Sequence, residues 1–327
     1  MANEKKGYAS KDHVVRDSKA IEEMVLYEKD AKKKIAFITF NRPELMNAAP
    51  WPLTQRLRYL VRDAECDPEV KVIVLRGAGR HFGVGDDIWE AGYVVGLGAG
   101  RTVEEREKPS IKRRLVGEVG TDEGGEKWMG IRSGGELGID SIKPIIAQVQ
   151  GYCYGIHMMI IMACDIVIAS EDALFTQPWW RYIGGLINWS LLIELVGLRK
   201  AQEMVLTCRP LDAYEAEKFG LITKVVPTDK LEETVLEYAQ VVSIVPGDVI
   251  AVGKMMCQLA LQARGLEIGQ QAISIGHCLG THQHYQPDEW NFLKDRRDKG
   301  VAGAVANRDS MVPPRFRQSM RSRAQTK

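Results

Sequence analysis

The sequence lacks the paired cysteines that zinc sites and disulfide frameworks need, because none of its cysteines falls at a CxxC or similar spacing. Six cysteines are scattered along 327 residues, a pattern typical of reduced thiols in a cytoplasmic protein: Cys66, Cys153, Cys164, Cys208, Cys257 and Cys278. A charge excess is also lacking, since 44 Lys and Arg residues face 43 Asp and Glu residues, for a net charge of +1. We therefore expect no metal site, and neither nucleic acid nor a membrane surface as a partner.

Long apolar runs are absent as well. The opening segment MANEKKGYASKDH has no apolar signal region, and no stretch approaches the roughly 20 apolar residues that span a bilayer. What is present is ordinary for an α/β enzyme: 45% hydrophobic residues and 31 glycines, in a chain long enough for one large domain with an appendage. We therefore expect a soluble cytoplasmic protein.

Apolar periodicity predicts strands alternating with helices over the first two thirds of the chain. The expected strands are 24–28, 35–40, 70–75, 142–149, 165–169, 173–175 and a short one that ends at 225–226. The expected helices are 53–64, 191–196, 200–207, 213–219, 231–242, 249–264 and 288–297. This order predicts an α/β fold with a core over 21–230 and a helical region over 231–300. The charged, aperiodic ends predict a flexible arm over 1–20 and a mobile basic tail over 301–327.

Residues 92–140 interrupt the predicted core. They mix glycines with charges of both signs and show weak periodicity. Such a segment is either a surface insertion or a glycine-hinged lid over a binding site, and the sequence leaves both interpretations open.

The stretch from Gly151 to Ile166, GYCYGIHMMIIMACDI, combines a glycine turn with an apolar helix. The first N–H groups of a helix have no partner within it, and they lie at the positive end of its dipole. Such a helix start can hold an anion or a developing oxyanion. The alternative is a buried core helix after a tight turn, which the same residues would also produce.

Five blocks of the chain resemble a known family. They are NRPELMNA (41–48), RHFGVGDDIWE (80–90), KPIIAQVQGYCYG (143–155), CDIVIASEDALFTQP (164–178) and LRKAQEMVLTCRPLDAYEAEKFGLITKVVP (198–227). In this order and spacing they resemble the crotonase (enoyl-CoA hydratase/isomerase) superfamily over residues 24–300. The resemblance implies a spiral of ββα units that binds acyl-CoA thioesters, with 231–300 as a trimerisation region of a homotrimer or a dimer of trimers.

By this resemblance, two backbone N–H groups hold the thioester carbonyl and stabilise the oxyanion formed from it. The matching donors are those of Val84 and Ile156. The best-known hydratases also use two glutamates, but the matching positions here hold Met159 and Trp179, neither of which transfers a proton. The standard hydratase mechanism is therefore not supported by the sequence.

Two residues are candidates to replace those glutamates. His157 lies two positions before Met159, beside the expected donor, and an imidazole there is either an acid or base or a satisfied core residue. Asp86 precedes Asp87, which stands where a helix beginning at Ile88 would be capped. Asp86 is therefore the candidate for substrate contact or proton transfer.

The remaining candidates concern binding. Tyr154, Met159, Trp179, Trp180 and Arg181 are expected around the acyl group, where two tryptophans would favour a flat or cyclic substrate, although large aromatics more often pack in a core. The resemblance gives as coenzyme A contacts Ala48, Asp87, Ile88, Phe292 and Lys294. It implies that coenzyme A is part of the substrate and that no cofactor is tightly bound.

Three functions remain compatible with the sequence. The first is an acyl-CoA enzyme with non-standard acid and base groups, acting as hydratase, isomerase or lyase on a bulky or cyclic acyl group. The second is a retro-Claisen hydrolase that cleaves a carbon–carbon bond of a cyclic β-diketone or its CoA ester. The third is an acyl-CoA-binding protein without turnover.

Overall fold

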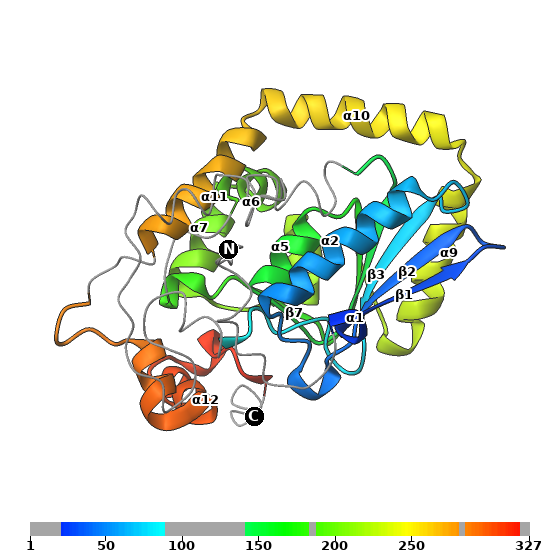
Figure 1. Ribbon diagram of the computed structural model, residues 1–327. Coiled ribbons are helices and arrows are strands. Elements are labelled where there is room, and N and C mark those ends of the chain that lie inside the picture. The colour runs from blue at the N-terminus through cyan, green and yellow to red at the C-terminus, as the bar shows by residue number, and fades with distance from the viewer. Residues whose placement is uncertain (1–20, 89–140, 183–187, 281–284, 321–327) are drawn as a thin grey trace, which may run out of the picture.

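The computed structural model describes residues 21–88, 141–182, 188–280 and 285–320. The expected arm over 1–20 and the expected insertion over 92–140 lie outside these ranges. Figure 1 shows a twisted sheet with helices on both faces and a helical C-terminal third that extends from it.

The main sheet has six strands in the order β1-β2-β3-β4-β6-β9. The first pair is an antiparallel hairpin, and all other neighbours are parallel. The strands are β1 (Val25–Asp30), β2 (Ile35–Phe40), β3 (Val72–Gly77), β4 (Ile145–Val149), β6 (Ile166–Ser170) and β9 (Lys224–Val226). The carboxyl ends of the parallel strands lie along one edge of the sheet, where ligands of such sheets usually bind.

Both faces of the sheet are covered, which explains why its central strands are apolar without alternation. On one face, Leu231, Val235 and Ala239 of α9 (Leu231–Ile244) pack on strand residues such as Val74. On the other face, the main core forms beneath α2 (Trp51–Cys66) and α5 (Ile156–Met162). Figure 1 shows α9 and the pair α2 and α5 on opposite sides of the strands.

A small second sheet, in the order β5-β7-β8, carries the turn into α5. Its strands are β5 (Tyr152–Tyr154), β7 (Leu174–Thr176) and β8 (Leu211–Asp212). Since β5 and β7 are parallel, the residues after Tyr154 and after Thr176 lie side by side. This register brings Gly155 next to Gln177.

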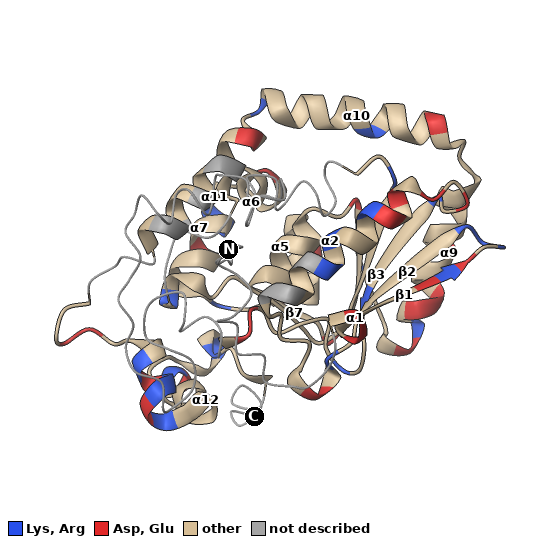
Figure 2. Cartoon of the chain, in the orientation of Figure 1, with Lys and Arg blue, Asp and Glu red and all other residues tan. Residues whose placement is uncertain are grey.

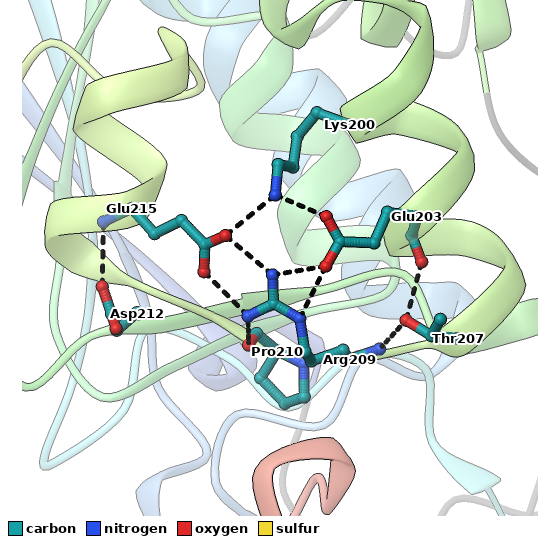
Figure 3. Close-up of polar contacts among 7 residues, drawn as sticks. All are labelled: Lys200, Glu203, Thr207, Arg209, Pro210, Asp212 and Glu215. Carbon is teal, nitrogen blue, oxygen red and sulfur yellow. Dashed lines mark hydrogen bonds and ion pairs between the residues drawn. The ribbon is translucent and has the colours of Figure 1, made fainter.

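The two helices on either side of β8 are joined by a cluster of ion pairs. Figure 3 shows Lys200 and Glu203 of α7 (Leu198–Thr207) in contact with Glu215 of α8 (Ala213–Phe219). Arg209, in the segment between the two helices, contacts both glutamates. Arg209 lies 2.7 Å from a carboxylate oxygen of each glutamate, and Lys200 lies 2.5 Å from Glu203 and 2.9 Å from Glu215. Gly220, with a φ of 84°, ends α8, as glycine commonly does at a left-handed helix end.

The remaining described elements are α-helices and short 3-10 helices (η). They are α1 (Ile21–Met24), η1 (Pro43–Leu45), η3 (Trp179–Arg181), α6 (Trp189–Val196), η4 (Thr228–Lys230), α10 (Gly247–Ala263), α11 (Leu266–Gly280), α12 (Phe292–Ser310) and η5 (Pro314–Phe316). Among the described helices, none alone has the length and apolar composition to span a membrane. The bent pair Thr228–Ile244 and Gly247–Ala263, at 102°, meets that test by length and composition only.

The C-terminal segment differs from the mobile tail expected over 301–327. Helix α12 continues to Ser310, with a break at Gly300, and Arg308, Asp309 and Gln318 are buried. Arg308 and Asp309 pair at 2.9 Å, and the N–H groups of Gln318 and Ser319 donate to Asp309. The prediction of a mobile tail was wrong over these residues, because their charged side chains bind one another and the backbone and are not solvated. Residues 321–327 lie outside the described ranges.

Candidate active site

The site is built where the loop after β3 meets the turn after β4. Gly83 pairs with Cys153 of β5, and Asp86 pairs with Ala49, both as parallel bridges. The N–H of Gly83 donates to the carbonyl of Tyr152 at 2.8 Å, and the N–H of Tyr154 donates back to Gly83 at 3.0 Å. The loop over 82–87 is therefore held from both sides like a short inner strand.

The glycine turn before α5 is fixed by the chain after β7. Gly155 has a φ of 55° and a ψ of −123°, a region that residues with a side chain avoid. Its N–H donates to Thr176 at 3.0 Å, and its carbonyl accepts from the side-chain amide of the buried Gln177 at 3.0 Å. Sequence reasoning passed over Gln177, although the Gln-Pro of its block was the available signal.

Asp86 and Trp179 meet above this turn. The indole N–H of Trp179 donates to Oδ2 of Asp86 at 2.8 Å. A Cβ on Gly155 would stand 3.2 Å from the same oxygen and 3.5 Å from the indole nitrogen. A carboxylate is therefore held beside the start of α5, in a fixed direction, by a donor from the loop after β7.

The backbone N–H groups of the loop over 82–87 point in directions that contradict the prediction for Val84. The N–H of Val84, expected to hold an oxyanion, donates to the carbonyl of Met46 at 3.0 Å. Those of Gly85 and Asp87 donate to the His157 ring and to the Ala49 carbonyl. Because Ala49 pairs with the residues on either side of Asp86, the N–H of Asp86 points away from Ala49, as alternation along a parallel strand requires.

Ile156 behaves as predicted in its position. It is the first residue of α5, and its N–H has no acceptor among the described residues. It follows directly on Gly155, against which the carboxylate of Asp86 lies. The start of α5 and the Asp86 segment therefore converge.

His157 lies behind the loop instead of facing outward. Its side chain has an exposed fraction of 0%, and its ring packs edge-on against Phe40 and Phe82 at centroid distances of 4.9 and 5.8 Å. Burial lowers the pKa of the imidazole from 6.5 to about 3. A group that stays neutral and fully covered is a poor proton carrier at neutral pH, so the prediction of His157 as acid or base is wrong.

Met159 and Trp179 lie together, as the resemblance implied. Each is 8% exposed, and both pack in one apolar cluster with Ile273 of α11, which Ile156 and Tyr182 border. Sequence reasoning missed Ile273, because no local signal links a helix residue to Met159 and Trp179, which lie far earlier in the chain. The cluster offers apolar contact and no proton-transfer group.

Three other expected substrate contacts are engaged elsewhere. Tyr154 is 4% exposed, and its hydroxyl donates to the carbonyl of Gln318 at 2.8 Å. Arg181 donates to the carbonyl of Thr207 at 2.5 Å, at the end of α7. Trp180 is 42% exposed and packs its ring on Trp189 at 5.6 Å, outside the cluster of Trp179. Tyr154 and Arg181 therefore serve the protein's own structure, whereas the exposed Trp180 remains a predicted contact.

Among the expected coenzyme A contacts, the side chains of Asp87 and Phe292 are buried and that of Lys294 is exposed. Asp87 is 3% exposed and forms an ion pair of 3.3 Å with the fully buried Arg42, whose guanidinium also donates to the carbonyl of Ala48. Ile88, the next residue, is the last described one before residue 141 and is helical, but the carboxylate of Asp87 faces Arg42. The side chain of Asp87 is therefore unavailable to a ligand.

Phe292 is likewise unavailable, since it is 1% exposed and packs on Tyr182 at a centroid distance of 4.6 Å. Ile88 packs in the same cluster, and its carbonyl accepts from Arg296 at 2.9 Å. Lys294 is exposed and remains a predicted contact. Within the described ranges, no group of three or more His, Cys, Asp or Glu side chains could hold a metal ion.

Comparisons with known proteins agree with this architecture. The family model described as Enoyl-CoA hydratase/isomerase matches residues 30–96 and 128–263, more than half of the chain. A short-chain-enoyl-CoA hydratase of Clostridium acetobutylicum is 30% identical over 288 residues, which cover 84% of this chain and 97% of that protein. A probable mitochondrial enoyl-CoA hydratase of Dictyostelium discoideum is 31% identical over 220 residues, 64% of this chain and 70% of that protein.

Solved structures give the same result. An enoyl-CoA hydratase/isomerase of Xanthobacter autotrophicus Py2 superposes with a TM-score of 0.70 at 27% identity, covering 89% of this chain and 98% of the other. The parallel sheet and the turn into α5 thus define an α/β protein of the crotonase fold, as the sequence predicted. The chain belongs to the enoyl-CoA hydratase/isomerase family and is an acyl-CoA enzyme of that kind.

Proposed function

We propose that this enzyme shifts a double bond within an acyl-CoA thioester by moving one proton, with Asp86 as the proton carrier. The observation that carries the proposal is the Asp86 carboxylate, held at 2.8 Å by Trp179 against the Gly155 turn. We infer a thioester substrate from the family, and we infer the acid or base from the position of the Asp86 carboxylate.

The thioester oxygen would be held by the N–H groups of Asp86 and Ile156. The structure directs the first away from Ala49, and the second opens α5, where the helix dipole favours negative charge. Two such donors stabilise the enolate that forms when a proton leaves the carbon next to the thioester, and losing one donor typically costs about 10²–10³ in rate.

One carboxylate suffices for this reaction. Asp86 would take the proton from the carbon next to the thioester and return it at the far end of the dienolate, so that the double bond moves and the carboxylate is restored. Hydration would also need a positioned water and a second group, and the matched positions hold Met159 and Trp179. The cluster that they form with Ile273 favours a bulky or cyclic apolar acyl group.

Asp86→Asn tests the assignment. We expect turnover of a 3-enoyl-CoA panel, followed as the gain of conjugated thioester absorbance, to fall by at least about 10². Stabilisation by acyl-CoA in a thermal shift assay should remain, because binding does not require the proton transfer. Glu171→Gln, an exposed acid after β6, is the matched control and should leave turnover unchanged.

Three results would contradict the proposal. Asp86→Asn with wild-type turnover would remove Asp86 from the chemistry. Ring opening of a cyclic β-diketone without coenzyme A would indicate a retro-Claisen hydrolase. Ligand stabilisation with no turnover of any enoyl-CoA, by the unmodified enzyme, would indicate a binding protein.

We also propose that the chain assembles as a homotrimer or a dimer of trimers, with coenzyme A carried only as part of the substrate. Helix α10 supports assembly, because it has no buried residue although most of its side chains are apolar. Figure 2 shows it almost without charge, and Asp248 and Lys254 are its only charged residues.

A further inference from the structure

His157 makes a contact that neither its burial nor the proposed chemistry requires. The N–H of Gly85 donates to Nδ1 of the ring at 3.2 Å, across 72 positions of the sequence. His157 is the second residue of α5, directly after Ile156, and Gly85 directly precedes Asp86. One side chain therefore connects the two segments whose N–H groups the proposed function uses.

The shape of the loop makes room for this ring. A Cβ on Gly83 would stand 2.2 Å from both Nε2 and Cδ2 of His157, so a larger residue there would collide with the imidazole. Gly85 has a φ of 104°, which places its N–H toward the ring in a conformation that glycine tolerates. The two glycines and the histidine thus fit one another as a unit.

This contact and a second hydrogen bond hold the two peptide groups on either side of Gly85, and the second of these groups carries the Asp86 N–H. Gly85 is held at its N–H by His157, and its carbonyl accepts from the N–H of Ala49 at 2.8 Å. The Gly85 carbonyl and the Asp86 N–H belong to one planar peptide group. Anchoring Gly85 at both ends therefore sets the direction of the Asp86 N–H relative to α5.

The hydrogen bond also fixes the state of the ring. Because Nδ1 accepts, the neutral imidazole carries its proton on Nε2, which has no partner within the described residues. The low pKa that burial imposes keeps Nδ1 an acceptor throughout the physiological range. A protonated ring would have two donors and would lose Gly85.

We propose that His157 is a positioning residue that aligns the two halves of the oxyanion site by accepting the Gly85 N–H. The inference rests on the proposed oxyanion role of the Asp86 and Ile156 N–H groups. His157 itself touches no substrate. Its contribution is realised in the transition state, because a misdirected donor weakens the oxyanion more than it weakens the bound substrate.

Two variants of similar size separate this role from core filling. His157→Leu fills the space without an acceptor, and we expect kcat to fall by about 10² while KM changes less than about threefold. His157→Asn offers Oδ1 near the place of Nδ1, and we expect it to recover at least tenfold of that loss. The pH profile of kcat should keep both of its limbs in His157→Asn.

Other outcomes would overturn the inference. Wild-type kcat in His157→Leu would make the ring a core filler. Loss of one limb of the pH profile in both variants would make His157 an acid or base.

A measurement on the unmodified enzyme tests the inference even if both His157 variants fail to fold. The ¹⁵N spectrum of the histidines should show a ring with the proton on Nε2 at every pH between 5 and 8, and an Nδ1–H or protonated ring would refute the hydrogen bond. The spectrum needs no substrate, so its result is independent of turnover. Failure of Asp86→Asn to lose activity would defeat the proposed function and leave this spectrum unchanged.

Discussion

At the scale of single residues, the buried pair of Arg42 and Asp87 anchors the site loop. Asp87→Ala would remove a carboxylate that pairs with a fully buried guanidinium, and breaking a buried pair in this way typically costs about 3–5 kcal/mol. We expect the free energy of unfolding in urea to fall by that amount. Asp87→Asn, which keeps an acceptor, should lose less.

The exposed pair of Lys230 and Glu233, at 2.9 Å, provides the control for this experiment. Lys230→Ala should cause no measurable loss, since exposed pairs are screened by water and salt. Equal losses in Asp87→Ala and Lys230→Ala would show that Arg42 finds other partners. The comparison therefore measures what burial adds to an ion pair of the same charges.

Residue roles were only partly predictable from the sequence. The position of Ile156 followed from a glycine turn before an apolar run, and the pairing of Met159 with Trp179 followed from the family blocks. The roles of Val84 and His157 did not follow, because they depend on which way a peptide or ring faces. A one-residue difference along a strand reverses the direction of an N–H, and no pattern of residue types records it.

At the scale of elements, the ion cluster between α7 and α8 predicts a response to acid. Hydrogen bonds from Arg209 lower the pKa of Glu215 from 4.5 to about 2. The folded state therefore holds Glu215 charged more strongly than the unfolded state does, and this stabilisation is complete above about pH 4.5 and is lost as the pH falls toward 2. Glu215→Gln should have a lower Tm at pH 7, and the gap to wild type should narrow between pH 4.5 and 2.

Glu171→Gln serves as the control here as well, because the side chain of Glu171 is exposed. A Glu215→Gln gap that stays constant with pH would mean that the loss comes from packing and not from charge. The measurement is a series of thermal unfolding curves at fixed ionic strength, since surface pairs weaken with salt.

Most elements were predictable because their signals are local. The strands of the main sheet and the helices over 51–66, 198–207 and 213–219 follow from apolar periodicity and from glycine or proline at their ends. The segment after Gly300 was not predictable in the same way. Its order comes from contacts between Asp309 and Gln318 and between Gln318 and Tyr154, which are distant in the chain.

At the scale of the whole molecule, the folded chain leaves an apolar surface that water would disfavour. Val249, Val252, Met256 and Leu259 recur at helical spacing on α10 and are 61%, 63%, 63% and 61% exposed. Lys254, on the same helix, binds Asp165 at 2.6 Å and so ties α10 to the core. A helix fixed in place with an exposed apolar stripe is typical of an interface between chains.

We therefore expect light scattering after size exclusion to give a mass of three or six chains. The double variant Val252→Glu and Met256→Glu would bury charges at such an interface, and it should elute as a monomer with the helical circular dichroism of the wild type. Leu206→Glu on α7, 66% exposed, is the control for a charge at another apolar surface position and should keep the assembly. If the wild type is a monomer, or if the double variant still assembles, α10 is not an interface between chains. Because α11, which supplies Ile273 to the Met159 cluster, follows α10 directly, the monomer should also lose activity.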